Sequence, residues 1–248
     1  FLLTPLTYGM YPEYISDPAI YVCPSSASHK VEQMYNDDGT CVLSQLKPDG
    51  YQSWWHAMFS YFYLGWVLDK CDEDDPKTEA GPIVSSINSI AGWNIDPAKY
   101  ADEYIPFQFM YALMALLLES NTNFLEWSQT GPITLQDVFR VLDGDVKVTE
   151  GAGNGGPDST IIYRLREGVE RFMITDINNP GASAQAQTSI WIMFDILSVN
   201  PSDFNHVPGG ANVLYMDGHV EFVKYPNQNA PVSRTAATAM GVAQIAGG

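Results

Sequence analysis

A chain of 248 residues with 46% hydrophobic and 12% aromatic residues has the composition of a folded globular domain, which excludes an intrinsically disordered protein. Its 29 acidic and 12 basic side chains give a formal net charge of −17, and such a surface repels nucleic acid and anionic lipid. The most apolar run, residues 107–118, is shorter than the roughly 20 residues of a membrane-spanning helix, so no membrane span is predicted.

The first fifty residues are predicted to be irregular, because prolines interrupt them repeatedly. Within them, residues 19–23 have the composition of a short strand. Residues 53–68 are dense in aromatic side chains, and Gly65 is expected to mark a bulge or a close approach of the backbone. Core packing is the favoured use of these aromatics, each of which buries about 150–250 Å². Residues 69–75 hold five acidic side chains without EF-hand spacing and predict a solvated loop.

Four helices are predicted from capping residues and apolar spacing. Asp96-Pro97 begins a helix to about residue 103, and residues 107–119 form a second one, apolar nearly all round and therefore central and buried. Thr134 caps a third helix that ends before residues 143–145. Residues 161–174 begin like a strand and continue with helical spacing.

A glycine-rich loop, residues 150–158, is the best candidate for a calcium site. Flexible backbone carbonyls and hard carboxylates suit Ca²⁺. The candidate ligands are Asp143, Asp145, Glu150 and Asp158. The alternative is a surface loop without a metal. No zinc site is predicted, because the cysteines lack Cys-x-x-Cys spacing and the four histidines are scattered.

Near the C-terminus, residues 190–197 predict a strand, and the stretch 204–225 predicts a β-hairpin that follows the Pro208-Gly209-Gly210 run. Asp217-Gly218 suits a two-residue type I′ turn between two alternating apolar runs. That turn pairs Tyr215 with Val220 and Val213 with Phe222 on one core-facing stripe. The tail, residues 226–248, is small and apolar, so it should dock on its own domain or insert into a neighbouring subunit.

No fixed-period repeat and no clear linker divides the chain. We therefore predict one domain over residues 1–248 of the α+β class, with helices packed on an antiparallel β-sheet that includes the C-terminal hairpin.

The hairpin sequence resembles the C-terminal signature of bacterial prepilin-like proteins, which have a type IV pilin or type II secretion pseudopilin type of N-terminus and are abundant in planctomycetes and their relatives. A histidine is followed by ten residues and then by Asp-Gly, where the family usually has nine. Residues 14–25 and 164–180 resemble the same group. The family motif residues here are His206, Gly209, Gly210, Asp217, Gly218 and His219.

The resemblance also leads to expectations about the N-terminus and the cysteines. Mature pilins begin with Phe and a long apolar helix, but Pro5 follows Phe1 here, so we expect that helix to have been removed or to lie upstream. Cys23 matches a Cys-Pro-Ser element of the family, whose partner is expected in that N-terminal helix. Cys41 and Cys71, two loop cysteines in acidic, turn-rich settings, are then the predicted disulfide.

The resemblance, and the absence of familiar catalytic motifs, favour a non-enzymatic extracellular or cell-surface protein that assembles with itself or with other pilin-like subunits. One alternative is a secreted metal-dependent hydrolase that uses His206, Asp217 and His219, with Glu221 nearby. Another is a carbohydrate-binding surface module that uses Trp54, Trp55 and Trp66. Hydrogen bonding of His206 around the Gly-Gly turn is the purely structural interpretation of the hairpin.

Overall fold

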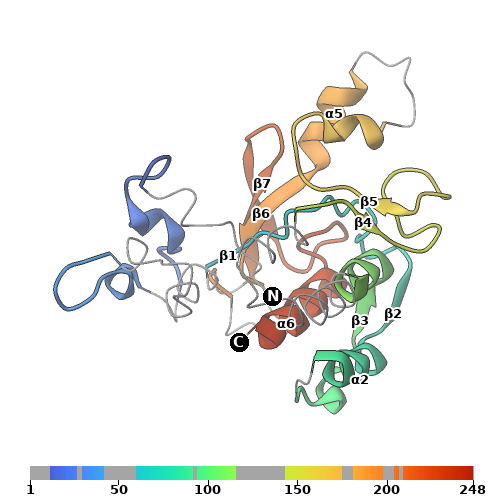
Figure 1. Ribbon diagram of the computed structural model, residues 1–248, viewed down its shortest axis with the longest axis horizontal. Coiled ribbons are helices and arrows are strands. Elements are labelled where there is room, and N and C mark those ends of the chain that lie inside the picture. Colours follow the sequence, from blue (N-terminus) through green and yellow to red (C-terminus); the bar gives the residue numbers. More distant parts are fainter. Residues whose placement is uncertain are drawn as a thin grey trace, which may run out of the picture.

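A computed structural model describes residues 12–26, 30–41, 60–91, 94–115, 143–174, 181–197, 204–206 and 209–247. In this part of the chain the fold is α+β, as predicted. A four-stranded antiparallel sheet has the strand order β1-β6-β7-β8. The strands are β1 (Tyr61–Phe62), β6 (Trp191–Asp195), β7 (Gly210–Tyr215) and β8 (Val220–Lys224). Figure 1 shows β6 and β7 beside each other, with the N-terminal segment in blue at one side.

Two small sheets, three α-helices with defined ends and several shorter helical segments complete the described part of the fold. The small sheets pair β2 (Lys77–Glu79) with β3 (Tyr104–Pro106), and β4 (Val146–Lys147) with β5 (Ile161–Ile162). The helices are α2 (Ala80–Ala91), α5 (Ala182–Ser189) and α6 (Arg234–Gly247), and residues 107–115 are also helical. Short 3-10 helices are η2 (Pro18–Tyr21), η3 (Val31–Met34), η5 (Pro97–Tyr100) and η6 (Val169–Phe172).

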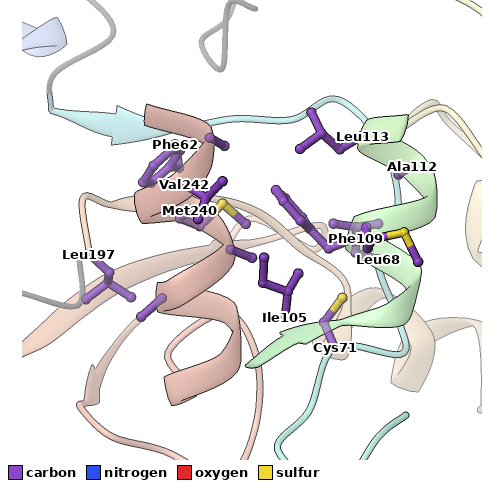
Figure 2. Close-up of a cluster of buried hydrophobic side chains, with 14 of the residues drawn as sticks. Phe62, Leu68, Cys71, Ile105, Phe109, Ala112, Leu113, Leu197, Met240 and Val242 are labelled. Carbon is purple, nitrogen blue, oxygen red and sulfur yellow. The ribbon is translucent and has the colours of Figure 1, made fainter. Parts of the chain in front are cut away.

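The apolar tail forms α6, and α6 lies in the main hydrophobic core. Six of its apolar side chains are almost fully buried, those of Ala236, Ala237, Ala239, Met240, Val242 and Ala243. Figure 2 shows Met240 and Val242 near Phe62 of β1, with Ile105 and Phe109 between α6 and the helix of residues 107–115. The tail therefore docks on its own domain, and the predicted buried helix is confirmed over residues 107–115.

The acidic loop anchors the start of α6. The carboxylate of Glu73 accepts hydrogen bonds from the backbone N–H and the hydroxyl of Thr235. Its position beside the first N–H groups of the helix also suits the positive end of the helix dipole. Arg234 donates to Glu103 at 2.8 and 3.2 Å, which ties the same end to the strand β3 region. Residues 69–75 therefore help to hold the start of α6 in place, in addition to forming the predicted solvated loop.

Three predicted elements are wrong in type. Residues 19–23 do not form a strand, because the Asp17 carboxylate caps η2 by accepting from the Ala19 N–H, and Pro18 begins it. The helix expected from Asp96 to residue 103 is only the short η5, after which β3 begins. Residues 161–174 split into β5 and η6, because Gly168 adopts a left-handed φ of 78° between them. The predicted helix at residues 134–142 lies outside the described residues.

The hairpin is present, but its register differs by one residue from the prediction. Leu214 pairs with Val220, and the N–H of Gly218 donates to the carbonyl of Tyr215. A type I′ turn needs a positive φ at both central residues, but of Asp217 and Gly218 only Gly218 has one, 90°. The connection therefore has three residues. A one-residue slip exchanges the faces of a strand, which leaves Val220 60% and Phe222 49% exposed. Their predicted place on the core-facing stripe is therefore wrong.

The predicted Cys41–Cys71 disulfide is also wrong. The structure contains no bond among Cys23, Cys41 and Cys71, all of which are buried. Cys41 packs in a small N-terminal cluster with Met34, whereas Cys71 belongs to the main core. The two thiols therefore pack in different parts of the fold.

Candidate functional site

The sheet has a core-facing side and a polar outer side. Phe194 and Val213 pair across β6 and β7 and are buried in the core. Their neighbours Asp195 and Asn212 therefore point to the opposite side, because side chains alternate along a strand. Tyr61 of β1 is paired with Asp195 and shares this outer side.

His206 and Cys23 reach the same place from outside the sheet. His206 lies in the connection between β6 and β7, and Cys23 follows η2 of the N-terminal segment. The imidazole Nε2 of His206 is 2.9 Å from Oδ2 of Asp195 and 3.5 Å from Sγ of Cys23. We call Cys23, Asp195 and His206 the outer-face cluster. Their ligand-type atoms all lie within 4.8 Å of one another, and this is the metal-compatible group found among the described residues.

Asn212 holds the carboxylate of the outer-face cluster. Its backbone N–H and its side-chain Nδ2 both donate to Oδ2 of Asp195, each at 2.8 Å. The same Nδ2 lies 3.1 Å from Nε2 of His206. Phe222 of β8 packs edge-on against the imidazole, with 5.9 Å between the ring centroids. The cluster is thereby held by three strands and two loops.

Burial and negative charge set the acidity of the groups around Asp195. Burial raises the pKa of the Cys23 thiol; backbone hydrogen bonds at Ser25 and Ser26 oppose this shift, and the charge of Asp195 adds to it. Burial, with smaller contributions from Cys23 and Asp195, raises the pKa of Tyr61 to about 12. Both groups therefore keep their protons at neutral pH.

The arrangement does not match a nucleophilic triad. In such a triad the nucleophile contacts one nitrogen of the imidazole and the carboxylate orients the other. Here Cys23 and Asp195 both face the same nitrogen, Nε2. A thiol with a raised pKa also has little reactive thiolate. Metal ligation fits the three atoms better than acyl transfer does.

The other motif residues lie at the far end of the hairpin. The Asp217 carboxylate accepts from the backbone N–H of His219 and contacts its Nδ1 at 2.5 Å. The imidazole of His219 stacks on Tyr215. Gly218 closes the turn, whereas Gly209, near Tyr225, and Gly210, beside Phe222, lie at the opposite end, where β7 begins.

His206 and the turn residues therefore do not share a site. His206 contacts Asn212, near the start of β7, while Asp217 and His219 follow its end. Glu221 is paired with Val213 and joins no metal-compatible group among the described residues. The ligand set predicted for a metal-dependent hydrolase is not brought together.

The predicted calcium loop holds a lysine. The ammonium group of Lys70 donates to three carbonyl oxygens of the loop, those of Gly151, Gly153 and Gly156, at 3.1, 2.6 and 3.2 Å. The neighbouring carboxylate of Asp69 accepts from the side chain of Asn154. A cation is thus present where calcium was expected, but the protein itself supplies it.

The predicted calcium ligands are also separated from one another. Asp145 accepts two hydrogen bonds from the guanidinium of Arg166, at 2.8 and 3.0 Å, and one from the N–H of Arg164. Asp143 pairs with Arg164. Neither they nor Glu150 and Asp158 belong to a metal-compatible group in the described part of the chain, so the structure does not bring the four predicted ligands together.

Trp66 gives no support to a sugar-binding platform. Its ring is buried, its Nε1 donates to the carbonyl of Gly144, and the guanidinium of Arg164 lies over it. The same guanidinium fills the space where a Cβ of Gly65 would lie, which confirms the predicted close approach. Trp54 and Trp55 lie outside the described residues.

Sequence reasoning missed Asp195 and Asn212, and it used Cys23 only as a family marker. One signal was visible for Asp195, which is a single carboxylate inside the apolar run 190–197. A charged residue in a buried strand needs a partner of opposite charge or a metal ion, so the position of Asp195 in the sequence indicates a candidate site residue. No local spacing points to Cys23, which is 183 residues from His206.

Comparison of the chain with protein-family models, with curated proteins and with solved structures gives no match. The prepilin-like resemblance therefore stays a prediction. Among the described residues, every helix is too short or too polar to cross a bilayer.

Proposed function

We propose that this protein is a non-enzymatic structural subunit, pilin- or pseudopilin-like, that self-assembles into an extracellular filament or a cell-surface assembly. The observation that carries the proposal is the edge strand β8. It is the last strand of the four-stranded sheet and exposes Val220 and Phe222. An edge strand with apolar side chains favours addition of another strand or another subunit.

The resemblance described above supports the same proposal. Its motif residues form or flank the hairpin that presents β8, since Gly210 begins β7 and Gly218 closes the turn. The partner is then a second copy of the chain or a related subunit that offers a compatible edge.

The negative charge shapes how such an assembly forms. Copies that each carry −17 repel one another at low ionic strength. Salt screens this repulsion, and a divalent cation such as Ca²⁺ bridges carboxylates of neighbouring copies. Calcium then acts between subunits, where it promotes assembly.

Light scattering over a concentration series, with and without salt and Ca²⁺, tests the proposal. We expect the mean mass to rise with concentration and with either addition. Val220→Glu places a charge on the exposed edge and should shift the assembly midpoint at least about tenfold, equivalent to about 1.4 kcal/mol. Tyr14→Glu is the matched control, because Tyr14 is 84% exposed and lies outside the sheet. A monomer of constant mass under every condition, or equal effects of both variants, contradicts the proposal.

A further inference from the structure

Three polar atoms converge on one nitrogen of His206. Sγ of Cys23, Oδ2 of Asp195 and Nδ2 of Asn212 lie 3.5, 2.9 and 3.1 Å from Nε2. A ring nitrogen either donates one proton or accepts with one lone pair. One such atom makes only one of these contacts as a full hydrogen bond, so the three atoms gather more closely around Nε2 than a single hydrogen bond requires.

The buried carboxylate of Asp195 calls for a positive charge. The residue is 1% exposed, and its hydrogen-bond donors from Asn212 are neutral. A buried ionised carboxylate is expensive unless it is paired or ligates a metal. Among the ion pairs of the described residues, its partner is His206, whose side chain retains 24% exposure.

The distances in the outer-face cluster are close to those around a tetrahedral ion. Zinc bonds of about 2.3 Å to sulfur and about 2.0–2.1 Å to nitrogen and oxygen place the sulfur about 3.6 Å and the oxygen about 3.3 Å from the nitrogen. The structure has 3.5 Å and 2.9 Å. The separation of the carboxylate oxygen from the nitrogen therefore has to increase by about 0.4 Å, and the sulfur–oxygen separation is within 4.8 Å.

We propose that Cys23, Asp195 and His206 bind one transition-metal ion, with Zn²⁺ the best match to their donor set, and that this ion fastens the N-terminal segment to the outer side of the sheet. A thiolate, an imidazole and a carboxylate are zinc ligands, whereas a thiolate does not suit Ca²⁺ or Mg²⁺. On binding, the Cys23 thiol releases its proton to solvent. The thiolate and the carboxylate then balance the two positive charges of the ion, and water completes the fourth position on the exposed side of His206.

Asn212 is the positioning residue of this site. It fixes the carboxylate of Asp195 through two hydrogen bonds and does not need to touch the ion. Partners that orient a ligand typically contribute about 10–100-fold to metal affinity. The three ligands come from the N-terminal segment, the end of β6 and the β6–β7 connection, so one ion joins parts of the chain that are distant in sequence.

Metal titration of the chelator-treated protein tests the proposal, with Zn²⁺ and Co²⁺ as probes. We expect one ion per chain by elemental analysis, and a thiolate-to-cobalt charge-transfer band with Co²⁺ that Zn²⁺ displaces. Cys23→Ser should remove the band and weaken binding by more than about 100-fold, and Asn212→Ala should keep the band and weaken binding about 10–100-fold. Cys71→Ser is the matched control, because Cys71 is a buried thiol in the main core, and it should bind normally.

A second measurement needs no variant. In the wild-type chain, Zn²⁺ should slow the alkylation of Cys23 by a thiol reagent, measured by peptide mass spectrometry, while the rate at Cys71 stays unchanged. Zinc should also raise the thermal midpoint of the wild type. Absence of stoichiometric binding, a cobalt band that survives Cys23→Ser, or equal protection of both thiols overturns the proposal. These results are independent of whether the chain self-assembles.

Discussion

Replacing Asn154 by alanine should strongly destabilise the fold, although the residue lies in a glycine-rich loop. Asn154 is 2% exposed. Its side chain donates to the carbonyl of Val67 at 2.9 Å and to the carboxylate of Asp69 at 2.7 Å, and it accepts from the N–H of Tyr163 at 2.7 Å. The amide thus joins three separate segments.

The expected magnitude follows from the groups left without a partner. Asp69 keeps its bonds from Gly155 and Gln108, so its loss is partly compensated. The carbonyl of Val67 loses its side-chain partner in a buried setting, and the N–H of Tyr163 loses its partner in a partly buried one. Each buried unsatisfied group costs about 1–3 kcal/mol, which gives about 2–6 kcal/mol for Asn154→Ala. Small domains are stable by only about 5–15 kcal/mol, so the effect is large.

Urea denaturation followed by circular dichroism measures the free energy of unfolding. Asn154→Asp is informative beside the alanine variant, because it keeps the acceptor for Tyr163 but removes both donors and brings a second carboxylate to Asp69. It should be at least as destabilising at pH 7. Asn229→Ala, at an exposed asparagine, is the control and should change stability by less than about 0.5 kcal/mol. A loss below about 1 kcal/mol for Asn154→Ala, with an unchanged urea slope, refutes the reasoning.

Two further predictions concern charge and backbone conformation. Burial alone would raise the pKa of Asp145, but hydrogen bonds from Arg166 and from the N–H of Arg164 outweigh it and hold the pKa below its usual value. A depressed carboxyl pKa contributes stability above the unfolded value, near pH 4, and loses it as the pH falls further. Arg166→Gln should therefore lower stability at pH 7 and differ less from the wild type near pH 2; a constant difference contradicts this. Gly218→Ala should lower the free energy of unfolding, measured by urea denaturation, by about 1–2 kcal/mol because φ is 90° there, and Gly218→Asn should lower it less. Equal stability of the two variants contradicts a left-handed backbone at this position.

Local chemistry in the sequence was sufficient for the strands near the C-terminus. Residues 190–197 are apolar and end beside turn residues, and β6 lies within them. The alternating runs around Asp217-Gly218 predicted β7 and β8, both of which are present. Apolar residues on every side of 107–115 predicted a buried helix for the same reason, since such a segment has no polar face to present to water.

Local chemistry did not determine the hairpin register. Asp-Gly suits a two-residue loop, and it also suits a three-residue loop with Gly in the left-handed position. The observed register places Phe222 against His206 and leaves Val223 to pack on the core. Phe222 thus contacts a histidine outside the hairpin, and the local sequence pattern does not encode that contact.

A missed helix and a corrected loop show the same limit. α2 contains Gly81 and Pro82, which weaken a helix prediction, yet Pro82 lies in the first turn, where its missing N–H is not needed. The loop 150–158 was attractive for calcium because of its carbonyl groups. Lys70 reaches those groups from more than 80 residues away, so the tertiary structure decided which cation they bind.

What the sequence determined by itself is therefore the α+β class, the strands β6 to β8, the turn glycine and the buried helix, all of which follow from interactions between residues close in the chain. The tertiary structure alone decided the burial of the C-terminal tail, the separation of Cys41 from Cys71, and the meeting of Cys23, Asp195 and His206. The ligands of this cluster are up to 183 residues apart, and no local spacing encodes a contact at that distance. Their proximity results from the packing of the N-terminal segment against the outer side of the sheet.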